Sequence, residues 1–247
     1  MTKEILFDRE LLRQNCARSQ QGFAQHNFLH HEVANRIAEN VESLDRHFEN
    51  ILEIGGRDGY LSTLVGRRSA VMSAVEDCEK LDVAADSFDL VLSNLNLHFI
   101  NEIPQFLLQV KEALKPDGVF IASFFGEENL HELAHVLHQS EIEIYGGISP
   151  RMPPTIDVKT AAALLQKAGF ADPISEFAKI EVNYSDPMKL LKDLKFMGQS
   201  NILTKRSRRF FTKKFLAKIL ENYRKLYGSP DGTVLATFEI ITVTGWK

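Results

Sequence analysis

The stretch best suited to chemistry is a short apolar run, residues 51–54, that leads through a glycine-rich turn into a helical pattern at 60–65. Its acid and its glycines are Glu53, Gly55, Gly56 and Gly59. Glycine lets the backbone adopt positive φ angles and approach a ligand closely. A strand, a glycine loop and a helix in this order are typical of a nucleotide-like cofactor site, although many such loops are only tight turns.

A second candidate is His131-Glu132-Leu133-Ala134-His135, which matches the zinc-protease pattern H-E-x-x-H. In that pattern two histidines one helical turn apart bind the metal, and the glutamate acts as the base. A third ligand would have to come from His138, Glu141, Glu143 or a more distant residue. The same residues also fit a polar surface helix, and we predict that structure and no metal site.

A third feature is a local run of basic residues: Lys205, Arg206, Arg208, Arg209, Lys213, Lys214 and Lys218. Such a run is usually the solvated face of a helix, but it also suits the docking of an acidic carrier or protein partner. Aromatic and aliphatic residues follow the basic ones: Phe210, Phe211, Phe215, Ile219 and Leu220. We predict that these form the packing stripe of a helix and do not stack on nucleic-acid bases.

Apolar runs of strand length alternate with helical patterns in the first half of the chain. The predicted strands are 51–54, 70–75, 88–93 and 119–125, and the predicted helices are 27–45, 60–65 and 103–114. Near-continuous apolar runs suit strands that are buried on both faces of a parallel sheet. This alternation predicts an α/β fold with a doubly wound, mostly parallel sheet.

The second half is more helical. The predicted helices are 128–144, 157–168 and a set within 186–227, and the predicted strands are 174–184 and 233–244. Asp157 is expected to cap its helix, and Gly169 to end it. No linker or repeat divides the chain, so we predict one domain, 1–247, with an N-terminal helical arm at 1–48 and a helical insertion before the last strand.

Composition limits the classes of function. The 247 residues are 44% hydrophobic and 25% charged with a net charge of -4, so nothing global points to nucleic acid or an anionic membrane as a partner. No apolar run approaches the roughly 18 residues that span a bilayer, and the N-terminus lacks a secretory apolar core. The two cysteines, Cys16 and Cys78, cannot form a disulfide framework or a zinc cage. We therefore predict a reducing, cytoplasmic setting.

Several short motifs are distributed over nearly the whole length of the chain: 6–9, 88–99, 114–120, 168–170, 197–201, 231–238 and 245–247. Together they resemble one branch of the class I S-adenosylmethionine-dependent methyltransferases. That branch is the complex I assembly factor 5 family of arginine hydroxylases with its alphaproteobacterial relatives. The malonyl-carrier-protein methyltransferases of biotin synthesis are a neighbouring branch. The resemblance implies a Rossmann-like fold with S-adenosyl-L-methionine as the cofactor.

In such folds the loop after the first strand holds the amino-acid part and the ribose of the cofactor. The cofactor-binding residues that the resemblance implies around this loop and the strand at 88–93 are Glu53, Gly55, Gly56, Gly59 and Asn94. Asn94 follows its strand at the carboxyl edge of the sheet, where ligands bind. His98 is a candidate general base, although in relatives this position more often packs under the cofactor.

One departure from the family pattern is Arg57, which stands where relatives have a glycine. A side chain that turns away would leave binding intact. A side chain that turns inward would place a cation beside the positive charges of the cofactor or attract a carboxylate.

The second departure is a shortened region after the loop, where relatives carry a further strand and helix. We infer that these have collapsed into the single strand 70–75, which a right-handed crossover places beside 51–54. The residues that follow it, Glu76, Asp77 and Cys78, would then contact the cofactor, with Glu76 or Asp77 holding the ribose hydroxyls. The alternative is that these acids form only a solvated turn.

These observations predict a methyltransferase-family enzyme whose substrate is a protein side chain or an acyl-carrier-bound group. Methyl transfer follows from the fold, and arginine hydroxylation in complex I assembly is the alternative specific to the subfamily. Helical cap segments at 126–155 and 185–228 are expected to cover the cofactor. A non-catalytic assembly or chaperone scaffold that has lost cofactor binding is the rival, favoured by Arg57 and the shortened region.

Overall fold

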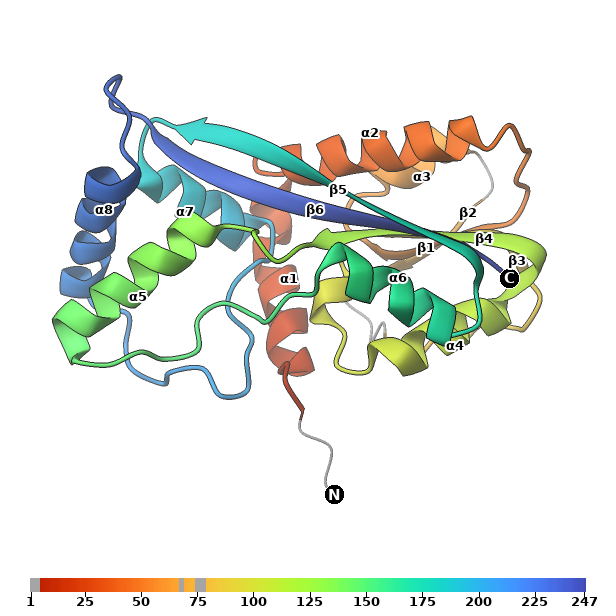
Figure 1. Ribbon diagram of the computed structural model, residues 1–247, viewed down its shortest axis with the longest axis horizontal. Coiled ribbons are helices and arrows are strands. Elements are labelled where there is room, and N and C mark those ends of the chain that lie inside the picture. The colour runs from red at the N-terminus through yellow and green to blue at the C-terminus, as the bar shows by residue number, and fades with distance from the viewer. Residues whose placement is uncertain (1–4, 67–68, 74–78) are drawn as a thin grey trace. The chain divides into compact units, whose positions relative to one another are not determined.

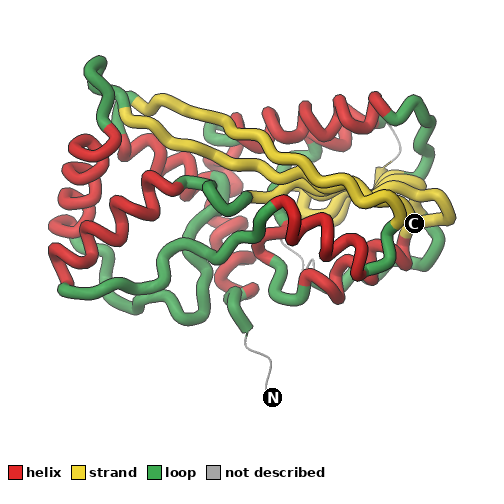
Figure 2. Tube along the Cα trace, in the orientation of Figure 1, coloured by secondary structure: helices red, strands yellow, loops and turns green. Residues whose placement is uncertain are grey.

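Strands and helices alternate along the computed structural model, which describes residues 5–66, 69–73 and 79–247 (Figure 1, Figure 2). The helices are α1 (Arg9–Phe23), α2 (Phe28–Ser43), α3 (Tyr60–Val65), α4 (Ile103–Ala113), α5 (His131–Tyr145), α6 (Val158–Lys167), α7 (Pro187–Phe196) and α8 (Lys213–Tyr227). The strands are β1 (Ile51–Gly56), β2 (Ser69–Ser73), β3 (Phe88–Asn94), β4 (Leu114–Phe125), β5 (Ala171–Tyr184) and β6 (Val234–Trp246). A 3-10 helix, Leu97–Phe99, follows β3.

The sheet has the strand order β2-β1-β3-β4-β6-β5. β1 pairs in parallel with β2 and β3, β3 pairs in parallel with β4, and β6 runs antiparallel to β4. Ile54 lies opposite Ser93, and Ser93 lies opposite Ala122, so the carboxyl ends of the parallel strands reach one common edge. The predicted doubly wound, mostly parallel sheet is confirmed.

The shortened region forms the strand that we predicted beside β1. β2 pairs with β1 in parallel register, with Ser69 opposite Ile51 and Met72 opposite Ile54. The predicted strand extended to residue 75, and residues 74–78 lie outside the described residues, as therefore do the predicted cofactor contacts Glu76, Asp77 and Cys78.

Polar side chains set the starts of several helices. Asp157 caps α6 by accepting a hydrogen bond from the backbone N–H of Thr160 at 2.6 Å, as predicted. Thr212 caps α8 by accepting from the N–H of Phe215 at 3.1 Å. The basic run therefore lies on a helix only from Lys213 onward, because residues 205–211 precede the cap and belong to the connection before α8.

The start of β4 also differs from the prediction. Residues 115–118 contain Pro116 and Gly118, which predicted a helix stop and a turn, but β4 already begins at Leu114. Leu114 pairs with Phe88 of β3, and the register then shifts before Leu90 meets Val119. Pairing with a distant strand overrides the local turn signal here.

Contacts divide the chain into two compact units. The sheet unit comprises residues 27–126, 155–178 and 240–247, and the helical unit comprises 1–26, 127–154 and 179–239. In the sheet unit, α2 and α3 lie on one face of the parallel strands, and α4 and α6 lie on the other (Figure 1). The predictions of a single domain, of an arm at 1–48 and of cap segments at 126–155 and 185–228 stay predictions.

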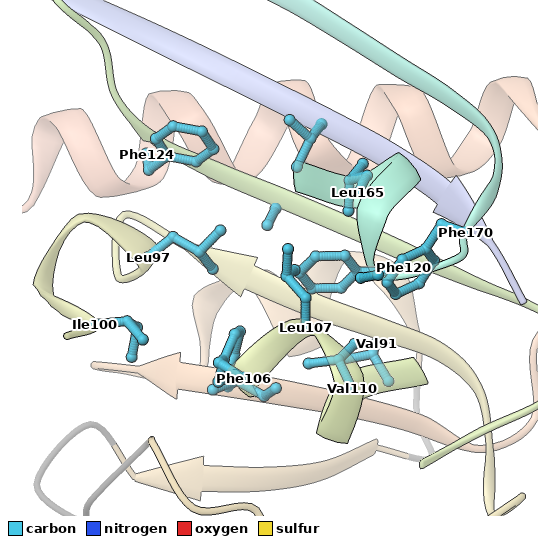
Figure 3. Close-up of a cluster of buried hydrophobic side chains, with 14 of the residues drawn as sticks. Val91, Leu97, Ile100, Phe106, Leu107, Val110, Phe120, Phe124, Leu165 and Phe170 are labelled. Atoms are coloured by element: carbon cyan, nitrogen blue, oxygen red, sulfur yellow. The ribbon is translucent and has the colours of Figure 1, made fainter. Parts of the chain in front are cut away.

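The core of the sheet unit lies between α4, α6 and the central strands (Figure 3). α4 contributes Phe106, Leu107 and Val110, which face the strands, and β4 contributes Phe120, whose ring lies 5.8 Å from that of Phe170. Phe106, Val110 and Phe120 are fully buried. Burial of these side chains fixes the sheet from which the polar residues at its carboxyl edge project.

Replacing Phe106 by alanine is expected to lower the free energy of unfolding by about 3–5 kcal/mol, because it leaves a cavity in this core. Leu108→Ala on the same helix is the matched control, since Leu108 is 50% exposed, and its expected cost is less than about 1 kcal/mol. Urea unfolding measures both, and equal costs would contradict the assignment of this helix face to the core.

Candidate functional site

The loop after β1 is closed by a buried carboxylate. Glu53 is only 3% exposed, and it accepts hydrogen bonds from the backbone N–H of Ser62, at 3.1 Å, and from the Ser62 hydroxyl. Burial raises the pKa of Glu53, and the two hydrogen bonds from Ser62 oppose that rise. The carboxylate therefore joins the middle of β1 to α3 and sets the path of the loop between them.

The three loop glycines are required for different reasons. At Gly55 φ is +78°, and an added Cβ would lie 2.6 Å from the Cγ of Asn96. At Gly56 an added Cβ would lie 2.7 Å from Oε1 of Glu53. Gly59 has φ +71° but open space around it. Gly55 and Gly56 thus let side chains approach the backbone, whereas Gly59 only permits the turn.

Asp58 fastens the loop to α2, which the sequence did not reveal. Its carboxylate accepts hydrogen bonds from Nδ2 of Asn27 at 3.3 Å and from the N–H of Tyr60 at 3.1 Å, and it lies 2.7 Å from Nε2 of His31. The His31 ring stacks on Tyr60 with the centroids 3.7 Å apart. Burial alone would raise the pKa of Asp58, but these hydrogen bonds outweigh it and lower the pKa.

Arg57 acts on a buried histidine of α2. Burial is the main reason that the pKa of His30 is lowered from 6.5 to about 3, and the positive charge of Arg57 adds to it. His98 contributes in the same direction, and Asp58 opposes it. His30 is therefore neutral at physiological pH. That an Arg57 side chain turned away from the loop leaves cofactor binding intact stays a prediction.

Two asparagines lie at the carboxyl edge, Asn94 as the last residue of β3 and Asn96 just after it. Asn94 donates from Nδ2 to the carbonyl of His30 at 2.9 Å, and the Asn96 side chain lies against Gly55. Both residues are more than nine-tenths buried. Among the described residues, Oδ1 of Asn94 and Nδ2 of Asn96 have no hydrogen-bond partner. A buried acceptor and a buried donor of this kind are satisfied when a polar ligand or water occupies the edge.

His98 lies in the 3-10 helix and is 7% exposed. Its ring packs against Phe99 and Phe125, with centroid separations of 4.2 and 4.6 Å. Its predicted role as a general base stays a prediction. Of the predicted residues, Glu53, Gly55, Gly56, Gly59, Asn94 and His98 thus fall at or near the carboxyl edge of the sheet unit.

The H-E-x-x-H motif has a structural use in the helical unit. Glu132 is 1% exposed and accepts hydrogen bonds from the N–H and hydroxyl of Thr237, at 3.2 and 2.5 Å. His135 bonds through Nδ1 to the Tyr227 hydroxyl at 2.8 Å, and His131 packs edge-on to the same ring. Within the described ranges, the acid and histidine side chains form no group of three that could hold a metal.

Comparisons with known proteins agree with this architecture. The family model "Methyltransferase domain" matches residues 31–122. Arginine-hydroxylase NDUFAF5 of Mus musculus is 35% identical over 98% of this chain and 77% of its own length. Malonyl-[acyl-carrier protein] O-methyltransferase of Halorhodospira halophila is 28% identical over 97% of this chain and 88% of its own length. The YcgJ structure from Bacillus subtilis superposes with a TM-score of 0.57 at 13% identity, covering 88% of this chain and 98% of that one.

The family model identifies a methyltransferase domain in residues 31–122, and the similarity to YcgJ shows the fold. The chain belongs to the family of arginine-hydroxylase NDUFAF5. In the described part of the chain, every helix is too short or too polar to cross a membrane.

Substituting the loop glycines is expected to separate backbone strain from crowding. Gly59→Ala should cost about 1 kcal/mol of stability, because only its positive φ is penalised. Gly55→Ala should cost about 2–4 kcal/mol, because its new Cβ also meets Asn96. Urea unfolding of both variants checks this, and an equal cost would show that Asn96 does not press on the loop.

His30 should make stability fall in mild acid. Its pKa is lower in the folded chain than the ordinary 6.5, so it contributes stability above pH 6.5 that is lost as the pH falls toward the folded value. Between pH 7 and pH 5 the loss is expected to be about 2 kcal/mol. Urea unfolding across this range should show the wild type losing that much more than His30→Gln; parallel curves would disprove the assignment.

Proposed function

We propose that this protein binds S-adenosyl-L-methionine at the carboxyl edge of β1 and β3. The observation that carries the proposal is the pair of buried amide atoms without partners, Oδ1 of Asn94 and Nδ2 of Asn96, beside the Gly55 turn. A buried acceptor and a buried donor at this edge suit the ammonium and carboxylate groups of an amino acid. The amino-acid part of the cofactor carries both groups.

The protonation states of His30 and Asp58 are compatible with a cationic cofactor. His30 is held neutral by its lowered pKa, so at neutral pH it adds no repulsion to a sulfonium. Asp58 stays ionised because its hydrogen bonds lower its pKa. In this proposal Glu53, Gly55, Gly56 and Gly59 shape the loop, and the cofactor contacts of Glu76, Asp77 and Cys78 stay predictions from the sequence.

We propose a protein side chain or a carrier-bound group as the substrate. The cofactor supplies an activated methyl group, and the protein has to align the acceptor and exclude water. His98 would accept a proton from a nucleophile that carries one. Arginine hydroxylation is the second candidate, supported by the 35% identity to the arginine hydroxylase across nearly the whole chain. A cytoplasmic setting remains part of the proposal.

Cofactor binding is tested by titration with S-adenosylmethionine or S-adenosylhomocysteine. Ligand at a hundred times its dissociation constant should raise the free energy of unfolding by about 2.7 kcal/mol. Asn96→Ala should weaken binding about tenfold, because one hydrogen bond to a charged group is lost. Asn129→Ala is the matched control, since Asn129 also has a buried Oδ1 without a partner among the described residues but belongs to the helical unit.

If millimolar ligand gives no heat of binding and does not change the free energy of unfolding, the interpretation as an enzyme fails and the scaffold alternative stands. If ligand binds, mass spectrometry of modified substrate distinguishes the two reactions. Methyl transfer adds one methylene to the mass of the acceptor, whereas hydroxylation adds one oxygen atom.

A further inference from the structure

The connection between α7 and α8 contains a concentrated positive charge. Residues 205–214, here called the basic loop, comprise the end of this connection and the first two residues of α8. Their sequence is Lys-Arg-Ser-Arg-Arg-Phe-Phe-Thr-Lys-Lys, which contains no acid. The loop lies entirely in the helical unit, where α5 and α8 run side by side (Figure 1). The proposed cofactor site contains no residue of the basic loop.

The basic loop is held in place on both sides of its centre. Arg206 forms an ion pair with Asp8, with Nη2 and Oδ2 3.1 Å apart. The guanidinium of Arg209 lies over the Tyr145 ring, 5.2 Å from its centroid. The Phe211 ring meets the buried Phe215 edge to face, with the centroids 5.2 Å apart. These contacts give the middle of the loop a defined position.

Between these contacts the loop presents an aromatic ring to solvent. Phe210 is 91% exposed, more than any other large apolar side chain among the described residues. Arg208, Arg209, Lys213 and Lys214 beside it are also exposed. Phe211 beside it is 54% exposed, so the two rings extend the exposed apolar surface, and contiguous exposed apolar surface marks interaction sites. An aromatic residue flanked by arginine is typical of the centres of protein–protein interfaces.

Charge decides between the classes of partner. A membrane or a nucleic acid presents a broad anionic surface, which would also repel the rest of a chain whose net charge is -4. An acidic protein can meet the basic loop alone. We propose that the basic loop docks an acidic protein, with the Phe210 ring in an apolar pocket of the partner and the four exposed cations facing carboxylates around it.

The first experiment places the photoreactive residue p-benzoylphenylalanine at position 210 of the full chain in its native cells. The matched control carries it at Phe177, which is 58% exposed on β5. An acidic protein joined at position 210 and absent at 177 is the expected result. Adducts with lipid, or equal labelling at both positions, would overturn the proposal.

The second experiment measures the affinity of the purified partner for variants of the whole protein. Arg208→Glu with Arg209→Glu, and separately Phe210→Ala, should each weaken binding about tenfold or more. The charge-matched control is Lys189→Glu with Lys225→Glu, which reverses two exposed cations of α7 and α8 and should change binding less than about twofold. Equal losses in the control and the loop variants would contradict docking at this loop.

Vesicles of phosphatidylglycerol alone test the membrane alternative. Sedimentation of the wild-type chain, but not of Phe210→Ala, with these vesicles would assign the basic loop to lipid and overturn the proposal. Each readout measures association and not turnover, so docking and cofactor binding can fail independently.

Discussion

The geometry of the candidate site depends on the burial of one carboxylate. Removing Glu53 from water is costly, and the two hydrogen bonds from Ser62 offset that cost. The position of the carboxylate then excludes any side chain at Gly56, as Asn96 excludes one at Gly55. The loop between β1 and α3 is therefore specified by neighbours that crowd it, and not by the flexibility of glycine alone.

Much of the sheet unit could be predicted from the sequence because its strands are buried on both faces and leave near-continuous apolar runs. The loop glycines and Glu53 could also be located from the sequence, because a sharp turn after a buried strand leaves a local signature. The start of β4 was missed because it depends on pairing with Phe88, which lies far away in the sequence. The metal-like motif was ambiguous because the partner of Glu132 is Thr237, more than a hundred positions later.

The contacts of Asp58 and Asn96 show what sequence patterns leave out. Asp58 precedes a helix by two residues, which suggests a local cap, and the N–H of Tyr60 does bond to it. Its bonding to His31 and Asn27 arises only because α2 packs against the loop. Asn96 follows β3 in a stretch where polar and apolar residues alternate, and both kinds are buried, which this alternation does not indicate. Tertiary packing, and not local preference, creates these parts of the site.

The end of the chain supplies an optical probe. Trp246 is the single tryptophan of the sequence, and it lies in β6 opposite Val119, where the antiparallel strand joins the parallel ones. Its indole is half-buried. Fluorescence excited selectively at this indole therefore originates at the pairing of β6 with β4. A change in its emission during refolding reports the addition of β6 to β4 without any attached dye.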